Sequence, residues 1–390
     1  MPTTTAVDAA RAVVGWYGDP TVSWSVLLHA TLHTPADPAA VEHRLAATVA
    51  RYPHLGDPPA VSIAAGSAWR ALLARFADEP YADGRPLVRV AAAADEPRLA
   101  IAAHHGATDG LGLLALLADA LGVTVSSSVR GVGERRSASS FALTAARRLA
   151  EAVFRPPARI SADGGNPAAT GDVLLAAELP NGAGSNGAGS NDVGSNCAVP
   201  DRALAGEPAA GGPAVRFGTG ALVAATARSV EAWNDRHGSR RRRGGRQVAG
   251  IGASRRGGDR LSPELDSAFL RVALPVRPGD AAVRRLVAAR PPEPAYPHTR
   301  SAAPQAVTRA LARRLGSTFL VSNLGRVHTG GAVRSLAFHP TASGRSGVAI
   351  GAATAGTMTT ITIRARRSDF DERAAGELLA AVVDELRRRH

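Results

Sequence analysis

The chain has 390 residues. This is longer than a single hydrophobic core usually supports, so the length predicts two domains or two lobes. Its net charge is +13, and all 46 basic residues are arginine because the sequence contains no lysine. This excludes Schiff-base chemistry and the phosphate-binding lysine of a Walker motif. The single cysteine, Cys197, excludes intrachain disulfides and zinc sites built from several cysteines.

The first 20 residues show no apolar run preceded by positive charge, which argues against a signal peptide. No window approaches the roughly 20 apolar residues that a membrane-spanning helix needs. We therefore expect a cytoplasmic, monomeric protein without a membrane span. Arginine binds phosphate well, so anionic cofactors or acidic partners stay open, although an alanine-, glycine- and arginine-rich composition without lysine also fits coding bias.

The first half of the chain alternates strands and helices. An ambiguous segment, helix or strand, covers residues 68–76. Strands are predicted over residues 22–32, 86–92 and 98–104. Helices are predicted over residues 38–52, 110–121 and 139–154. Residues 110–121 are apolar on nearly every side, which predicts a buried helix.

The composition changes near residue 161, where we place the boundary between an N-terminal lobe (1–160) and a C-terminal lobe (161–390). Glycine, serine and asparagine dominate a predicted flexible insertion at about residues 181–213. Strands are predicted over residues 172–179, 247–253, 268–276, 318–323, 332–338, 348–353 and 357–365. Helices are predicted over residues 217–237, 281–290, 301–315 and 370–389. The mixture predicts an α/β or α+β fold in two lobes.

Residues 104–110 concentrate proton-transfer chemistry beside a turn. An apolar strand leads into His104 and His105, and Asp109 precedes the buried helix that begins at Gly110. An imidazole with a pKa near 6.5 suits a general base at neutral pH, and we assign that role to His105. Asp109 could orient the histidine, bond an arginine, or merely cap the helix. In the alternative interpretation both histidines are ordinary core residues.

The sequence of residues 104–110 matches HHxxxDG in full, and in this it resembles the condensation-domain and CoA-dependent acyltransferase superfamily. That superfamily includes nonribosomal peptide condensation domains, chloramphenicol acetyltransferase, plant CoA acyltransferases and polyketide-associated acyltransferases of mycobacteria. Residues 51–55, 250–256 with 269–275, and the SNLG segment at 322–325 resemble further parts of it. The resemblance implies two chloramphenicol acetyltransferase-like lobes in a V, with an active-site channel between them.

The resemblance also implies roles for individual residues. His105 matches the catalytic base and His104 a mainly structural histidine. Asp109 matches an acid that pairs with an arginine of the other lobe, and Gly110 lets backbone approach the reaction centre. The arginine partner is Arg255 or Arg256, of which we prefer Arg255.

Two further segments are candidates for binding. Ser322 and Asn323 end a strand, where a hydroxyl and an amide could hydrogen-bond the thioester carbonyl or the acceptor. Turn chemistry is the alternative for these two residues. Residues 240–243 with Arg246 could hold CoA phosphates or an acidic carrier protein, or form a solvated loop. We predict no metal site, because the pair His29 and His33 has no acidic ligands nearby.

The predicted function is acyl transfer from a thioester, acyl-CoA or acyl-carrier protein, to a hydroxyl or amine in specialised metabolism. CoA or phosphopantetheine thioesters would serve as co-substrates, and no permanently bound cofactor is expected. One alternative is a free-standing nonribosomal-peptide-type condensation enzyme that uses only carrier-bound donors. The other is a non-catalytic docking or nucleic-acid-binding protein that uses its arginine surface.

Overall fold

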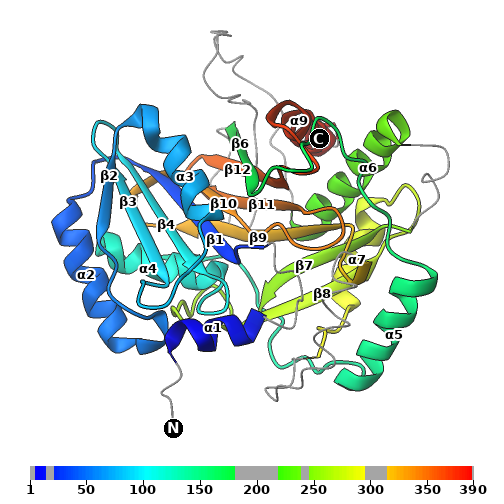
Figure 1. The fold of residues 1–390 in the computed structure, drawn as a ribbon, viewed down its shortest axis with the longest axis horizontal. Coiled ribbons are helices and arrows are strands. Elements are labelled where there is room, and N and C mark those ends of the chain that lie inside the picture. The colour runs from blue at the N-terminus through cyan, green and yellow to red at the C-terminus, as the bar shows by residue number, and fades with distance from the viewer. Residues whose placement is uncertain (1–4, 15–21, 181–217, 239–245, 295–313, 389–390) are drawn as a thin grey trace.

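The computed structural model describes residues 5–14, 22–180, 218–238, 246–294 and 314–388 (Figure 1). The helices are α1 (Ala6–Val14), α2 (Pro38–Arg51), α3 (Trp69–Asp78), α4 (Gly110–Leu121), α5 (Phe141–Phe154), α6 (Thr219–His237), α7 (Asp280–Ala289) and α9 (Glu372–Arg387). The strands are β1 (Ser25–Leu32), β2 (Val61–Ala64), β3 (Val88–Ala93), β4 (Arg98–His104), β5 (Ser126–Ser127), β6 (Asp172–Pro180), β7 (Val248–Ser254), β8 (Ser267–Ala273), β9 (Phe319–His328), β10 (Val333–His339), β11 (Val348–Ala355) and β12 (Met358–Arg366).

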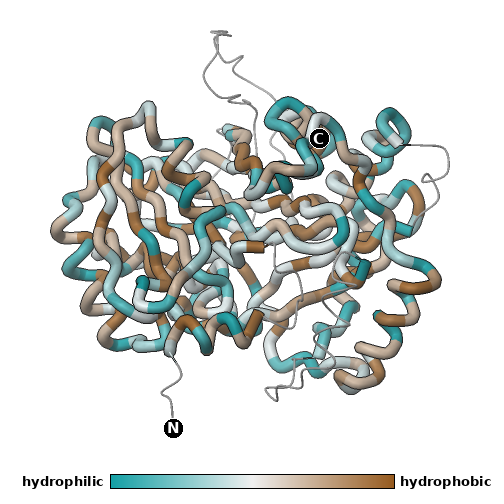
Figure 2. Tube along the Cα trace, viewed as in Figure 1, coloured by the Kyte–Doolittle hydropathy of each residue, from teal (hydrophilic) through white to brown (hydrophobic). Residues whose placement is uncertain are grey.

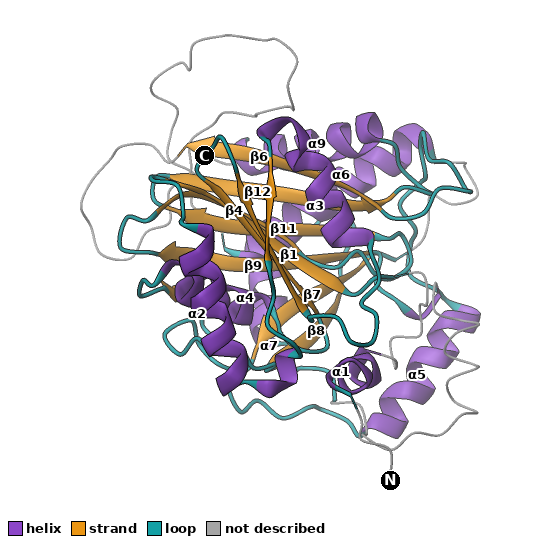
Figure 3. Ribbon diagram, turned by 60° about the vertical axis from the view of Figure 1, so that its left-hand side comes forward, coloured by secondary structure: helices purple, strands orange, loops and turns teal. Residues whose placement is uncertain are grey.

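The strands form two mixed sheets, which Figure 3 shows crossing one another. The first has five strands in the order β10-β1-β4-β3-β2. The second has seven, in the order β6-β12-β11-β9-β7-β8, with β5 paired to β9. Helices pack against both sheets, so the predicted mixed α/β architecture with two lobes is confirmed.

Strand β10 ties the two halves of the chain together. It comes from the second half of the sequence but pairs antiparallel with β1 in the first sheet, with Leu28 opposite Phe338. In the other direction, β5 of the first half pairs with β9 of the second sheet. The lobe boundary near residue 160 stays a prediction, and each sheet contains a strand from the other half of the sequence.

Local sequence explains the two helices that cover one face of the first sheet. Asp37 caps α2 by accepting a hydrogen bond from the backbone N–H of Ala39, and Pro38 stands at the first helical position. Helix α2 buries one face, formed by Val41, Leu45, Thr48 and Val49. Helix α4 is buried over most of its surface, as its continuous apolar sequence predicts.

Three clusters of buried residues fill the spaces between helices and sheets. Helices α6 and α9 pack on the seven-stranded sheet, with Trp233 and Phe370 fully buried there. Helices α2 and α4 cover one face of the five-stranded sheet, and α3 covers the other. Figure 2 shows apolar residues gathered along the strands, while polar residues lie on the outward turns of the helices.

Most of the predicted elements are present, within a few residues at their ends. The ambiguous segment at 68–76 is helical, as α3. The sequence analysis did not anticipate α1, β2 or β5. The predicted insertion at 181–213 and nearly all of the predicted helix over 301–315 lie outside the described residues.

Candidate active site

The HHxxxDG residues connect the end of a central strand to the start of a buried helix. Strand β4 ends at His104, and α4 begins at Gly110. The backbone N–H of His105 donates to the carbonyl of Trp24 at 2.6 Å, which extends the pairing of β4 with the chain before β1. The carbonyl of His104 accepts from Ala107 at 2.8 Å and closes the turn. The rigid strand therefore fixes the backbone that carries His105.

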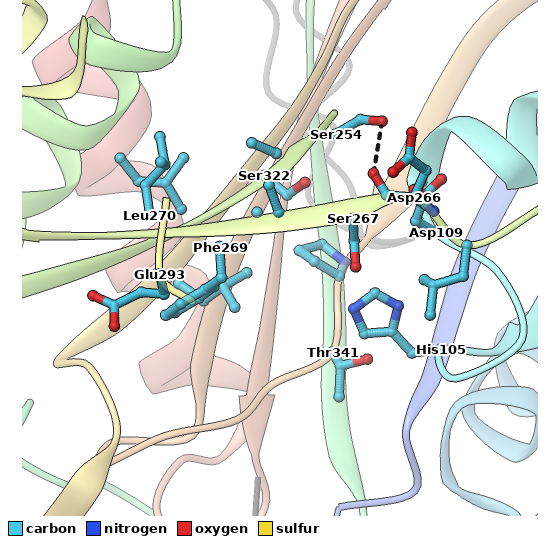
Figure 4. Close-up of a pocket in the computed structure, with 18 of the residues that line it drawn as sticks. His105, Asp109, Ser254, Asp266, Ser267, Phe269, Leu270, Glu293, Ser322 and Thr341 are labelled. Atoms are coloured by element: carbon cyan, nitrogen blue, oxygen red, sulfur yellow. Dashed lines mark hydrogen bonds between the residues drawn. The ribbon is translucent and has the colours of Figure 1, made fainter. Parts of the chain in front are cut away.

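His105 is held in the tautomer that a general base needs. Its Nδ1 lies 3.1 Å from the carbonyl oxygen of Thr108, so the proton resides on Nδ1 and the lone pair on Nε2. Burial lowers the pKa of His105 below its ordinary value, and the bond to Thr108 and the charge of Asp109 oppose that only in part. The neutral, proton-accepting form therefore dominates at neutral pH. Figure 4 shows the ring inside the cavity, beside Ser267 and Thr341.

His104 lies in the interior and is only 3% exposed. Its Nδ1 accepts a hydrogen bond from the backbone N–H of Gly106 at 3.0 Å, and Tyr81 packs edge-on against its ring at 5.2 Å. Burial lowers the pKa of His104 to about 4, with smaller contributions from the charges of His105, Arg11 and Arg89. This arrangement matches a supporting residue of the turn.

The carboxylate of Asp109 is fully engaged away from the histidines. One oxygen, Oδ1, accepts from the backbone N–H of Gly112 at 2.8 Å, as the N-cap of α4, and from Arg256, also at 2.8 Å. The other, Oδ2, accepts from the backbone N–H of Asp266 at 3.3 Å. Asp109 therefore joins the start of α4 to the loops that follow β7 and precede β8.

The preference for Arg255 as the partner of Asp109 is wrong. Arg256 makes the ion pair, and the carbonyl of Glu264 at 2.6 Å holds its guanidinium in place. Arg255 instead lines the cavity that contains His105. The preference erred because sequence spacing does not show which of two adjacent arginines faces inward.

Gly110 lies where any side chain would collide with the second half of the chain. A Cβ at this position would lie 2.8 Å from Cδ2 of Leu324 and 3.0 Å from Cζ of Phe338. The glycine therefore lets the start of α4 approach the SNLG segment of β9 and strand β10. Close packing here brings residues 322–324 to the cavity.

The two predicted polar residues of β9 behave differently. The side chain of Ser322 lines the cavity (Figure 4). The Oδ1 atom of Asn323 accepts from the backbone N–H of Gly325 at 2.8 Å, and Gly325 has φ of +65°. The prediction that Ser322 and Asn323 end a strand is wrong, because β9 continues to His328. The bond from Gly325 to Asn323 lies instead inside the strand, where the pairing of β9 with β11 shifts register. The NH₂ group of Asn323 remains available for hydrogen bonding.

A cavity of about 1690 Å³ surrounds His105 and draws its walls from both sheets. Several of the residues that line this cavity carry no signal in the sequence. Trp24 lines it with φ of +56°, a left-handed conformation that is rare outside glycine. Helix α1, the segment 128–132 and α5 also contribute, with an Arg148–Glu293 ion pair of 3.0 Å. No local motif marks these residues, because only tertiary packing brings them together.

Two remaining predictions concern basic and histidine residues. Residues 240–243 and Cys197 lie outside the described residues, whereas Arg246 lines a second, smaller cavity.

The ring of His29 stacks on that of His339, with centroids 5.6 Å apart. Within the described ranges there is no group of three or more His, Cys, Asp or Glu side chains arranged to hold a metal ion. Likewise, no helix in the described part has the length and apolar character to cross a membrane.

Comparisons with known proteins identify the fold. No family model matches the chain, and no curated protein sequence does. Among solved structures, a variant of the starter condensation domain of rhizomide synthetase RzmA, in complex with C8-CoA and Leu-SNAC, aligns with a TM-score of 0.55 and 14% identity, covering 98% of this chain and 93% of that one. The first condensation domain of the calcium-dependent antibiotic synthetase, in complex with a substrate analogue, aligns with a TM-score of 0.55 and 14% identity, and the alignment covers 97% of this chain and 94% of that one. These likenesses show that the chain has the two-lobed fold of condensation domains, as the resemblance of residues 104–110 implies.

Proposed function

We propose that this protein is an acyltransferase that moves an acyl group from a thioester donor to a hydroxyl or amine acceptor in specialised metabolism. The observation that carries the proposal is the placement of His105. A neutral imidazole, with its proton fixed on Nδ1 by Thr108, lies in a cavity built from both sheets. Such a group accepts a proton from a bound acceptor at neutral pH.

The proposed reaction conserves atoms and charge. The Nε2 atom of His105 takes the proton of the acceptor as the acceptor oxygen or nitrogen attacks the thioester carbonyl. The tetrahedral intermediate then breaks its carbon–sulfur bond, and the thiol leaves with the proton returned by the imidazolium. An ester or amide forms, and His105 is neutral again.

The remaining residues of the motif support this chemistry. The ion pair between Asp109 and Arg256 holds the start of α4, and hence the turn that carries His105, against the second sheet. His104 fills the interior behind the turn. We assign to Ser322 and the NH₂ group of Asn323 hydrogen bonds to the thioester carbonyl or the acceptor, since both residues line the cavity.

The donor class finds support in the structural neighbours. The rhizomide synthetase domain was solved with C8-CoA, an acyl thioester, and with Leu-SNAC. We extend to this chain the use of acyl-CoA or of a carrier-bound phosphopantetheine thioester as co-substrate. Transfer from carrier-bound donors alone would identify a free-standing condensation enzyme instead.

Purified protein offered acyl-CoA or acyl-carrier protein, with panels of alcohols and amines, tests the proposal. We expect thiol release together with a new ester or amide detected by mass spectrometry. The His105→Ala variant should lose about 10²–10⁴-fold in kcat. His43→Ala, an exposed histidine on α2, is the matched control and should retain full activity. An unimpaired His105→Ala enzyme, or salt-dependent nucleic-acid binding without any turnover, would contradict the proposal.

A further inference from the structure

A second cavity, of about 790 Å³, is lined by residues of α5 other than those that line the active-site cavity. It contains five arginines and one glutamate. We call it the arginine groove, and its charged residues are Arg147, Glu151, Arg155, Arg246, Arg271 and Arg290. The excess of positive charge makes it a site for a multiply charged anion.

Some arginines of the groove have no acidic partner and can therefore bind an anionic ligand. Arg271 donates to Glu151 at 2.6 Å, and Arg290 lies 3.9 Å from Glu293, so these two arginines already have acidic partners. Arg155 and Arg246 are exposed, and neither has an acidic partner within ion-pair distance among the described residues. The backbone of Ala158 donates to the carbonyl of Arg246 at 2.9 Å, which places the chain after α5 against Arg246. Two unpaired guanidinium groups therefore line one groove, a geometry suited to phosphate oxygens.

An aromatic ring accompanies these cations. Phe154 is the last residue of α5, lines the groove and is 81% exposed. Contact of an apolar phenylalanine ring with water is unfavourable in free energy, and a bound ligand that covers the ring removes this contact. Flat nucleobases stack well on such rings. A ring beside unpaired guanidinium groups matches a ligand that carries both a base and phosphates.

The groove and the active-site cavity both use residues of β8. Alternate residues of a strand share a face, so Ser267, Phe269, Arg271 and Ala273 follow one another on one side of β8. Ser267 lies beside His105, and Phe269 lies farther from His105 in the same cavity (Figure 4), whereas Arg271 and Ala273 line the groove. At ~3.3 Å per residue, Ser267 and Ala273 are about 20 Å apart, which is of the order of an extended phosphopantetheine arm.

Helix α5 separates the two cavities and borders both. Thr144, Ala145 and Arg148 line the active-site cavity, and Arg147 and Glu151 line the arginine groove. The Arg148–Glu293 ion pair lies in the wall of the active-site cavity. The Arg271–Glu151 ion pair links β8 to α5.

We propose that the arginine groove binds the phosphorylated adenosine end of a CoA thioester, whose pantetheine arm runs between β8 and α5 to His105. This inference rests on the proposed acyl transfer and names its donor as CoA. Arg155 and Arg246 bind phosphate oxygens, and Phe154 stacks on the adenine. A carrier protein offers no nucleobase to Phe154, so carrier-only transfer is the competing outcome.

Adenosine 3′,5′-bisphosphate, the nucleotide portion of CoA without the arm, is the direct probe. Calorimetric titration should show one site on the full chain, weakened about tenfold or more by Arg155→Gln/Arg246→Gln and by Phe154→Ala. The control is Arg75→Gln/Arg334→Gln, which removes the same charge from exposed positions outside the groove. Its affinity should stay within about twofold of the parent protein, since distant exposed charges are screened by salt.

A kinetic comparison provides a second readout. In the groove variants the KM for acyl-CoA should rise, while kcat and the KM for an acyl-N-acetylcysteamine thioester, which lacks the nucleotide, stay unchanged. No bisphosphate binding, or binding that the groove variants leave intact, overturns the inference. Transfer from carrier-bound donors without bisphosphate binding leaves the acyltransferase proposal standing and removes this one. Bisphosphate binding that depends on the groove, without transfer from any donor, leaves the nucleotide site standing and removes the acyltransferase proposal, and with it the role of CoA as donor.

Discussion

Asp109 and Arg256 form a buried ion pair that joins the two sheets: the Oδ1 atom of Asp109 lies 2.8 Å from a guanidinium nitrogen of Arg256. Their side chains are only 6% and 10% exposed. Asp109 caps the helix that follows β4 of the first sheet, whereas Arg256 follows β7 of the second. The pair therefore fixes the turn that carries His105 relative to the opposite wall of the cavity.

Removal of the arginine from this pair should be costly. Arg256→Gln leaves the carboxylate of Asp109 buried without a counter-charge, and loss of one partner of such a pair costs about 3–5 kcal/mol. Asp109→Asn should cost less, because an asparagine oxygen still caps α4. Urea denaturation monitored by circular dichroism measures both effects. Arg255→Gln is the matched control, and equal losses from Arg255→Gln and Arg256→Gln would contradict the assignment.

The acid limb of the activity profile should report His105. Burial lowers its pKa, so the neutral base predominates at and above the ordinary value near 6.5. We expect kcat/KM to be level at neutral pH and to fall only as the pH drops below 6.5, through the lowered pKa. A pH–rate profile on the parent enzyme measures the inflection. An inflection above 6.5 would show that a different group, or a charged His105, controls the rate.

The sequence predicts the turn around His105 well, because its contacts join residues that are close in sequence. The apolar run before His104 forms β4, and the continuous apolar helix after Asp109 is buried as α4. The turn between them forms from neighbours in sequence, since His105 bonds to Thr108 and Asp109 bonds to Gly112. Residue type and spacing determine such contacts.

Long-range contacts explain what the sequence analysis missed. The wall formed by Trp24, the arrival of β10 beside β1, and the choice of Arg256 over Arg255 all depend on segments distant in sequence. Helix α1 carries no marking motif, and its position is set by contact with the turn. A Cβ on Gly106 would lie 2.0 Å from the carbonyl oxygen of Ala10. No sequence periodicity encodes that approach.

Stability should fall as the solution becomes acidic, because several buried histidines are held neutral. Burial lowers the pKa of His29 and of His104 to about 4, and lowers that of His339 well below its ordinary value. Their contribution is complete above pH 6.5, the unfolded pKa, and is lost as the pH falls toward 4. Each of His29 and His104 accounts for about 3 kcal/mol over that interval.

Urea unfolding from pH 8 to 4.5 measures this dependence. Asp78 works in the opposite direction, because burial and the charge of Asp172 raise its pKa to about 6, and it offsets part of the loss. His29→Leu should flatten the acid side of the curve, since one titrating group is gone, whereas the exposed His43→Ala should leave its shape unchanged. A curve for His29→Leu as steep as that of the parent protein would contradict the prediction.

The contact between Gly110 and Leu324 should be visible as energetic coupling. Gly110→Ala places a methyl group 2.8 Å from Cδ2 of Leu324 and 3.0 Å from the ring of Phe338, and such overpacking costs about 1–3 kcal/mol. Leu324→Ala alone costs about 2–5 kcal/mol through the cavity it leaves. In the double variant the alanine methyl enters that space, so the combined loss should be smaller than the sum of the single losses. A double-mutant cycle by urea denaturation tests this, and strict additivity would show that the start of α4 relaxes away from β9 instead.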